Sequence, residues 1–473
     1  GLLWSVVQSW GGKLMTLLLF MVLARILDPH DLGVFAAASV VIAFIALFVE
    51  QGLSEAIVQR SEVSVAQLNT AFLINLCLAF GLLTALWFAS PLVATAMNIP
   101  ELESILRIAG LGLLVSAVSF TQLGMHRRNF NYRWIAMCSF SATVISGLVG
   151  VVLAYLGYGV WSLIVQMLLF TTLSGLLLWL RPQWAFSFDF DFKGTRPLFA
   201  YGMQRLGSNL LDFANNRYVE ILLATTLGPV ALGIYAVGIR VYQALMQALS
   251  SAILDVAHNG FSRLANDRPA LIQAFYQSVT LTSAVAVPPF LLLATISTEA
   301  TLALFGEKWI DSAEVMRPMA MLGALQVMQF YNVTSLNAIG RPGIGLNLMI
   351  LKTVTTVGVL WFARNESLAF IAYTFALCQL VTTIPSFFLV QRVLGVSNML
   401  VLKSVLPFLA SAGVATGLVV AIRGWIVQLD TGAWLEMIAL TAVWGSCYLC
   451  CTLLFARGKV IQTVRFVMNK KHA

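Results

Sequence analysis

The chain has 473 residues, of which 59% are hydrophobic and only 10% are charged. Soluble domains carry about 25% charged residues, so this composition excludes a soluble enzyme and a soluble nucleic-acid-binding protein. The mean hydropathy of +0.88 and apolar runs of about 20 residues without alternation predict an all-α polytopic membrane protein rather than a β-barrel.

Apolar runs separated by polar breaks predict fourteen transmembrane helices. In chain order the predicted ranges are 2–27, 32–52, 68–90, 104–124, 134–156, 159–180, 198–226, 231–256, 271–297, 315–339, 343–362, 367–391, 402–427 and 433–456. Several breaks carry turn residues, such as Asp28-Pro29 and Gly228-Pro229. The sequence starts at Gly1 without a methionine, so a short N-terminal piece is expected to be missing.

The distribution of basic residues predicts the orientation of these helices. With the N-terminus placed inside, most of the 28 Lys and Arg residues fall on the cytoplasmic side. Cytoplasmic loops of membrane proteins carry such an excess of positive charge. Both termini are therefore expected in the cytoplasm, which agrees with an even number of helices.

A fourteen-residue segment recurs two hundred residues along the chain. Residues 23–36 read LARILDPHDLGVFA, and residues 223–236 read LATTLGPVALGIYA. Seven positions are identical, including Pro29/Pro229 and Gly33/Gly233. Six predicted spans separate the two copies, so both halves would share one orientation. Parallel repeats of this kind are typical of transporters built from two lobes around a cleft.

The repeat predicts how the chain is divided. Residues 1–180 would form an N-terminal lobe of six helices, and residues 198–394 a pseudo-symmetric C-terminal lobe of six. Residues 181–197 would be a cytoplasmic linker between the lobes. Residues 395–473 would add two extra helices and a basic cytoplasmic tail.

Polar side chains within the predicted spans are the candidates for a substrate site, because charges in a membrane usually face a cavity or a partner. The predicted lining of a cationic central cavity comprises Lys13, Arg205, Asn209, Asn216, Arg217, Arg240, Gln243 and Gln247. Arg205, Asn209 and Asn216 share a narrow sector of one helix. Arg and Lys are suited to phosphate groups. The alternative is that these residues form hydrogen bonds that hold the helices together.

Carboxylates on the same helices are candidates for ion or proton coupling. They are Glu50, Glu55, Asp212 and Asp255. The offset of the repeat places Glu55 and Asp255 at equivalent positions of the two halves. The four histidines have no metal-ligand spacing, and there is no Walker A pattern, so neither a metal nor another cofactor is expected.

Two short motifs lie between the predicted spans. Residues 126–133 form a basic, aromatic loop, which is typical of an anchor at the lipid surface and also suits anionic headgroups. Asp189-Phe190-Asp191 is similar to a metal-binding acidic pair, but it lies in a short linker without a nucleotide-binding domain. This pair is what would favour a membrane glycosyltransferase or polymerase, the alternative from another class.

Several segments resemble a known family in their order and spacing. They are residues 23–27 with Gly33 downstream, residues 52–60, the basic loop with Phe130, and residues 305–309. The chain resembles the polysaccharide-transport family of the multidrug/oligosaccharidyl-lipid/polysaccharide (MOP) exporter superfamily, which contains the Wzx-type flippases, and within it the colanic-acid exporters. The resemblance implies fourteen helices in a V-shaped fold like that of the MATE drug antiporters, with alternating access.

The resemblance also implies a transporter rather than an enzyme. Its cargo would be undecaprenyl-pyrophosphate-linked oligosaccharide, moved from the inner to the outer leaflet of the bacterial inner membrane for exopolysaccharide, O-antigen or capsule synthesis. The expected partners are this substrate and membrane lipids. A polysaccharide polymerase and co-polymerase are further candidate partners, and no nucleic acid is expected. A peptidoglycan lipid-precursor flippase and a MATE-like drug or cation antiporter remain alternatives.

Overall fold

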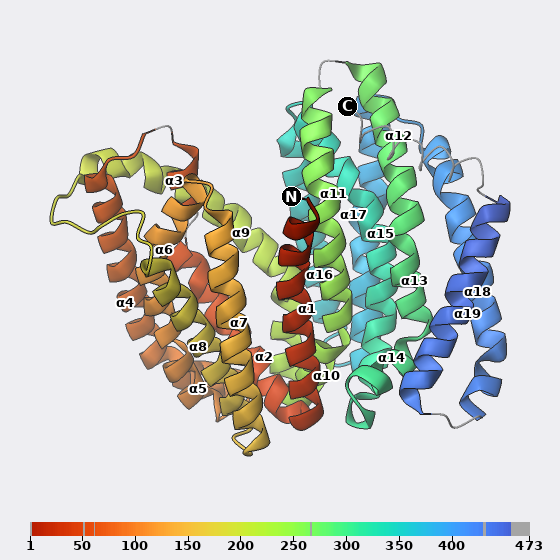
Figure 1. The fold of residues 1–473 in the computed structure, drawn as a ribbon, viewed down its shortest axis with the longest axis horizontal. Helices are drawn as coiled ribbons and strands as arrows, with labels where there is room; N and C mark the ends of the chain where they lie inside the picture. The colour runs from red at the N-terminus through yellow and green to blue at the C-terminus, as the bar shows by residue number, and fades with distance from the viewer. Residues whose placement is uncertain (1, 51–52, 61, 265–266, 429–431, 456–473) are drawn as a thin grey trace. The chain divides into compact units, whose positions relative to one another are not determined.

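The computed structural model describes residues 2–50, 53–60, 62–264, 267–428 and 432–455, and for some of these, among them Glu50, Glu55, Arg205 and Asp255, the backbone alone. The described residues form nineteen α-helices and one short 3-10 helix (Figure 1). The chain forms two compact units, which comprise residues 1–236 and 237–473. The predicted division into lobes joined by residues 181–197 stays a prediction.

The first unit contains the helices that position the candidate site. Their bounds are α1 Leu2–Ile26, α2 Pro29–Glu50, α3 Leu53–Gln59, α4 Val65–Ala96, α5 Leu102–Ala109, α6 Leu111–Arg128, α7 Tyr132–Tyr155, α8 Val160–Trp179 and α9 Phe192–Thr226. The next helix, α10 Gly228–Gly238, begins in this unit.

The second unit contains the remaining helices. They are α11 Arg240–Arg263, α12 Arg268–Val285, α13 Val287–Thr295, α14 Ser297–Leu304, the 3-10 helix η1 Glu307–Trp309, α15 Ser312–Ala338, α16 Pro342–Phe362, α17 Leu368–Leu394, α18 Asn398–Gln428 and α19 Ala433–Phe455. In this unit α15 packs against α11, α13 and α17, and α18 pairs with α19.

The predicted all-helical membrane class is confirmed. Within the described residues, eleven helical segments are long and apolar enough to cross a membrane. Each of the fourteen predicted ranges falls on one helix or on two consecutive helices. That all fourteen ranges cross the membrane stays a prediction, since α9 and α15 carry many polar residues and are not among the eleven.

Three ranges that were expected to be continuous helices are each divided in two. Range 104–124 is interrupted at Gly110, range 231–256 at Ile239 and range 271–297 at Ala286. Pro288 and Pro289 follow the last break, and they cannot donate the backbone hydrogen bonds that would continue α12. These prolines therefore account for the break between α12 and α13.

Small residues allow the helices of the first unit to approach one another closely. Gly147 of α7 lies against Leu19 of α1, and Gly150 of the same helix lies against Gln166 of α8. Gly175 of α8 lies against Ser119 of α6. Helix association in membranes depends on such small residues, because lipid provides little hydrophobic drive for it.

The two copies of the sequence repeat contact each other within the first unit. A Cβ atom added to Gly33 of α2 would overlap the backbone carbonyl of Pro229, and one added to Gly233 would overlap the carbonyl of Pro29. The contact is reciprocal, since the glycine of each copy lies against the proline of the other. The identical residues of the repeat therefore include those that form this contact, which is called here the glycine–proline contact.

Candidate functional site

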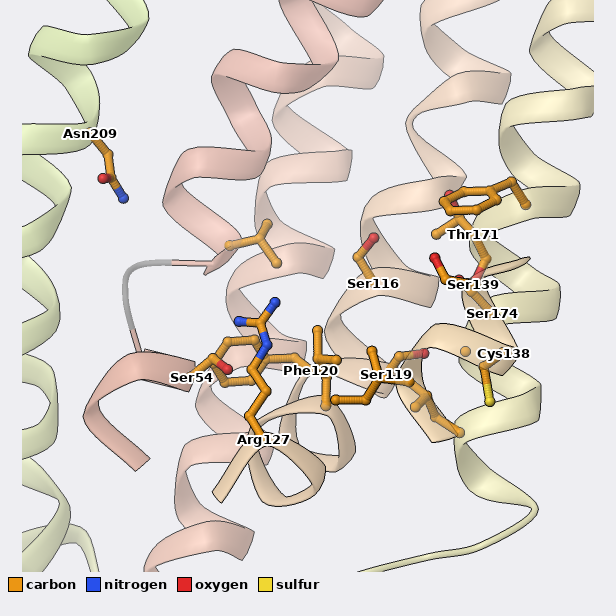
Figure 2. A pocket seen from close by; sticks show the side chains of 16 residues that line it. Ser54, Ser116, Ser119, Phe120, Arg127, Cys138, Ser139, Thr171, Ser174 and Asn209 are labelled. Atoms are coloured by element: carbon orange, nitrogen blue, oxygen red, sulfur yellow. The ribbon is translucent and has the colours of Figure 1, made fainter. Parts of the chain in front are cut away.

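A cavity of about 430 Å³ lies in the first unit between α6, α7 and α8 (Figure 2). Val49 of α2, Ser54 of α3 and Asn209 of α9 complete its wall. Six of its lining residues carry a hydroxyl group: Ser54, Ser116, Ser119, Ser139, Thr171 and Ser174. The cavity thus combines these hydroxyl groups with apolar side chains such as Phe120, Leu123 and Phe170.

The positions on α6 explain how the cavity is lined. Ser116, Ser119, Leu123 and Arg127 follow one face of this helix at spacings of three and four residues. At a rise of 1.5 Å per residue, the line from Ser116 to Arg127 is about 16 Å long. The cavity therefore has hydroxyl groups toward the middle of α6 and a guanidinium at its C-terminal turn.

The hydroxyl groups have a defined hydrogen-bonding direction. Ser119 Oγ donates to the carbonyl of Val115 at 3.0 Å, and Thr171 Oγ1 donates to that of Met167 at 3.0 Å. Ser174 Oγ donates to the carbonyl of Thr171 at 3.1 Å. A hydroxyl that has used its proton in this way still has lone pairs to accept hydrogen bonds. These three groups therefore suit a ligand that is rich in O–H or N–H donors, such as a sugar.

The two arginines at the end of α6 differ in their surroundings. Arg127 is exposed and lines the cavity, where Figure 2 shows it beside Ser54 and Phe120. Arg128 Nη1 donates to the carbonyls of Ile57 at 2.7 Å and of Arg60 at 2.6 Å, at the C-terminal end of α3. Arg128 thus caps α3 and holds Ser54 of that helix at the cavity, while Arg127 presents a positive charge to a ligand.

Among the predicted site residues of the first unit, Asn209 lines the cavity. Lys13 is half-buried on α1, and Asp212 and Asn216 are exposed on α9. The side chain of Arg205 lies outside the described residues, although its backbone belongs to α9. For these residues the predicted binding and coupling roles stay predictions.

Arg217 forms an ion pair within its own helix. Its Nη1 lies 2.8 Å from both carboxylate oxygens of Glu220, which is buried. An anionic ligand at Arg217 would therefore have to compete with a carboxylate that is already in place. The predicted role of Arg217 in substrate binding stays a prediction.

The predicted site residues of the second unit lie on α11. Arg240 and Gln243 are half-buried, and Gln247 is exposed. The side chain of Asp255, and those of Glu50 and Glu55 in the first unit, lie outside the described residues. Of the predicted site residues, Asn209 lines the cavity, and the roles of the others stay predictions.

The sequence did not single out the hydroxyl groups of the cavity. Serine and threonine are tolerated in membrane helices because their hydroxyls bond to the carbonyl one turn earlier, as Ser119 and Thr171 do. A single such residue therefore carries no signal. The signal available was the spacing of Ser116, Ser119 and Arg127 on one face of the predicted helix.

A family model described as "Polysaccharide biosynthesis protein" matches residues 22–314. The succinoglycan biosynthesis transport protein ExoT of Rhizobium meliloti is 27% identical over 368 residues, which cover 77% of this chain and 74% of that protein. The lipopolysaccharide biosynthesis protein WzxC of Escherichia coli is 25% identical over 402 residues, with 82% and 80% covered.

Solved structures show the same fold at low sequence identity. The lipid II flippase MurJ in an inward closed conformation has a TM-score of 0.80 at 13% identity, covering 97% of this chain and all (100%) of that one. An inward-facing multidrug resistance MATE family transporter of the MOP superfamily has a TM-score of 0.65 at 15% identity, with 82% and 98% covered. The fold is thus that of the MATE family transporter of the MOP superfamily, and the relatives agree with the predicted resemblance to polysaccharide-transport, Wzx-type proteins. Since the family model spans more than half of the chain, the protein belongs to the polysaccharide biosynthesis family.

Proposed function

We propose that the chain moves lipid-linked oligosaccharides, carried on undecaprenyl pyrophosphate, from the inner to the outer leaflet of a bacterial cytoplasmic membrane. Transport would proceed by alternating access between two lobes, with both termini in the cytoplasm. The observation that carries the proposal is the hydroxyl-lined cavity with Arg127 at one end, in a chain of the polysaccharide biosynthesis family.

The physical problem for such a substrate is its polar head. Sugars and phosphates lose their hydrogen bonds with water when they enter hydrocarbon, and each unsatisfied polar group costs several kcal/mol, on the order of 2–7. The cavity provides acceptors for sugar hydroxyls at Ser119, Thr171 and Ser174, and Asn209 can both donate and accept. The isoprenoid tail would remain among the lipids, where it needs no protein partner.

Arg127 provides the complementary charge. A guanidinium binds phosphate through two parallel N–H groups, and this bond is stronger than one between neutral groups. Its place at one end of the hydroxyl groups suits a ligand whose sugar is joined to a phosphate. Lys13, Arg205 and Arg240 remain proposed as further contacts for the anion along the path.

The membrane potential would favour this transport. Moving two negative charges out of a cell with an interior of about −100 mV releases roughly 5 kcal/mol, at about 2.3 kcal/mol per charge. The proposal is therefore that voltage supplies much of the driving force. Liposome flipping rates that do not respond to a clamped potential would contradict it.

A peptidoglycan lipid-precursor flippase is the second candidate. The fold likeness to the lipid II flippase MurJ is consistent with it, and the cavity chemistry suits either glycan. A MATE-like drug antiporter is less favoured, because the described residues that line the cavity include the Arg127 guanidinium and no carboxylate.

The proposal is tested with the purified full chain in liposomes. Fluorescent undecaprenyl-pyrophosphate trisaccharide is placed in both leaflets, and the fraction accessible to an external quencher is followed with time. The proposal expects flipping of this lipid above that in protein-free liposomes, and slower flipping of undecaprenyl phosphate without a sugar. Equal rates for both lipids would contradict recognition of the glycan, and transport of lipid II alone would favour the second candidate.

A further inference from the structure

An aromatic segment joins α8 to α9 at the edge of the first unit. Every second residue from position 184 to position 192 is aromatic: Trp184, Phe186, Phe188, Phe190 and Phe192. Figure 1 shows the yellow trace between these helices running beyond α4. This segment, residues 184–192, is called here the aromatic arm.

The rings of the arm form a continuous ladder. The ring centroids of Trp184 and Phe186 are 6.1 Å apart, and those of Phe186 and Phe188 are 5.2 Å apart. Phe190 lies 6.3 Å from Phe186 and 6.1 Å from Phe192. Rings that contact in series show that the aromatic side chains gather on one side of the arm.

The arm is held by α4, where the ring of Phe72 contacts those of Trp184 and Phe186, and one buried asparagine provides the hydrogen bonds. Asn69 Oδ1 accepts hydrogen bonds from Trp184 Nε1 at 3.0 Å and from the backbone N–H of Ser187 at 3.3 Å. Its Nδ2 donates to Ser187 Oγ at 2.8 Å and to the carbonyl of Asp189 at 2.9 Å. All four hydrogen bonds that an amide side chain can make are thus used to hold the arm.

The next residue of α4 and the start of α9 complete the attachment. Thr70 Oγ1 accepts a hydrogen bond from the backbone N–H of Asp191 at 2.8 Å. Asp191 Oδ1 in turn accepts one from the N–H of Gly194 at 2.8 Å and caps α9. The arm is therefore fixed at both the middle and the end, although only its last residue, Phe192, belongs to a helix.

Trp184 is buried at 5% exposed, but three other aromatic side chains of the arm remain exposed despite this attachment. Phe188 is 89% exposed, Phe192 is 59% exposed and Phe186 is 37% exposed. Exposed apolar groups that are held in a fixed array indicate an interaction surface rather than a loop in water.

The surroundings of the arm indicate a lipid surface as its partner. The arm begins five residues after the end of α8 and leads directly into α9, so it lies close to the end of a helix that is apolar and long enough to cross the membrane. Exposed cations flank it: Arg181, which stacks 4.3 Å from the ring centroid of Trp134, and Lys193 and Arg196. Aromatic rings flanked by Lys and Arg are typical of the membrane–water interface, and the cations favour anionic lipids.

We propose that the aromatic arm inserts Phe186, Phe188 and Phe192 into the anionic lipid surface beside the N-terminal end of α4, and so anchors the start of α9 at the membrane interface. With the predicted orientation this surface belongs to the cytoplasmic leaflet. The inference concerns how the chain sits in the bilayer and does not rest on the proposed substrate.

The depth of the arm can be measured by spin labelling of the full chain. The six cysteines are replaced by alanine, and a nitroxide is attached to Phe188→Cys or, as the matched control one residue away, to Asp189→Cys. The labelled protein is reconstituted in vesicles of phosphatidylethanolamine and phosphatidylglycerol. The ratio of collisions with oxygen to collisions with a water-soluble nickel chelate is expected to be severalfold higher at position 188 than at position 189.

Two results would overturn the inference. Equal access of the nickel chelate to both positions would place the arm in water, and low access of both reagents to position 188 would place it against protein. A second measurement keeps the native cysteines and replaces Phe188 by the photoreactive analogue benzoylphenylalanine. Lipid adducts in the mass spectrum after illumination would support the inference, and adducts to another protein chain without lipid adducts would overturn it.

Discussion

Replacement of Gly33 by alanine tests the glycine–proline contact. The new Cβ would overlap the backbone carbonyl of Pro229, which cannot rotate away as a side chain would. Overpacking of this kind costs about 1–3 kcal/mol. Because the overlap is with backbone, the upper part of this range applies, about 2–3 kcal/mol. Alanine has a higher helix propensity than glycine by about 1 kcal/mol, so the expected net loss is about 1–2 kcal/mol. For a unit of this size that loss lowers the Tm by about 2–8 °C.

The matched control is Gly81→Ala in α4, because no atom of a neighbouring residue lies within 4 Å of the added Cβ. Its Tm is expected to equal or slightly exceed that of the wild type, since only the propensity gain remains. Thermal unfolding of both purified variants in the same detergent provides the measurement. The Gly33→Ala, Gly233→Ala double variant should lose less than the sum of the single losses, because one separation of the helices relieves both overlaps. A Gly33→Ala protein as stable as the Gly81→Ala control would refute the reasoning.

Three further predictions concern charged and polar groups whose partners are known. Arg128→Gln should lower the Tm, because α3 loses a guanidinium that donates two charge-assisted hydrogen bonds, each worth about 1.5–3 kcal/mol. Arg127→Gln should leave the Tm unchanged and slow the flipping of the lipid-linked glycan in liposomes. Arg423→Gln should destabilise the protein by about 3–5 kcal/mol in thermal unfolding. The reason is that Glu299, which is 3% exposed, loses the guanidinium whose Nε lies 2.6 Å from its Oε1. A loss below about 1 kcal/mol would contradict this. Asn69→Ala should release the aromatic arm and speed amide hydrogen exchange of residues 185–191, and unchanged exchange would show that the arm is held by other contacts.

The positions of the helices could be predicted from the sequence because lipid imposes a minimum length on apolar runs. Within the described residues, every predicted range falls on helical structure. The break at Gly110 was not predicted, because a glycine by itself does not interrupt a helix. The structure shows that Leu83 and Leu86 of α4 pack directly on this glycine, which is a tertiary contact with no local signal.

The contact between the two copies of the repeat also could not be predicted from the sequence. The identity of Pro29 with Pro229 and of Gly33 with Gly233 predicted two related turns. That the two turns touch each other, glycine against proline, depends on how the helices pack within the first unit and became evident only in the structure.

The candidate site was predicted less completely than the fold. Polar and charged residues within apolar spans are candidates for a site because they are costly there. On this basis Asn209, which lines the cavity, was predicted together with residues whose roles stay predictions. The cavity instead depends on hydroxyl groups such as those of Ser119 and Ser174, which satisfy their protons within their own helices. Their common feature is that three helices bring them to one space, and a linear pattern does not contain that information.

Binding of a lipid-linked glycan to the cavity is the most direct test of the proposed transport. Native mass spectrometry gives the Kd of undecaprenyl-pyrophosphate trisaccharide for three full-length proteins: the wild type, the double variant Ser119→Ala, Ser174→Ala, and the control Ser162→Ala. The hydroxyl of Ser162 also bonds within its helix but does not line the cavity. Each lost hydrogen bond is worth about 0.5–1.5 kcal/mol, so the double variant should bind about 5- to 150-fold more weakly, while the control binds as the wild type does. Equal Kd values for all three proteins would contradict the assignment of the glycan to this cavity.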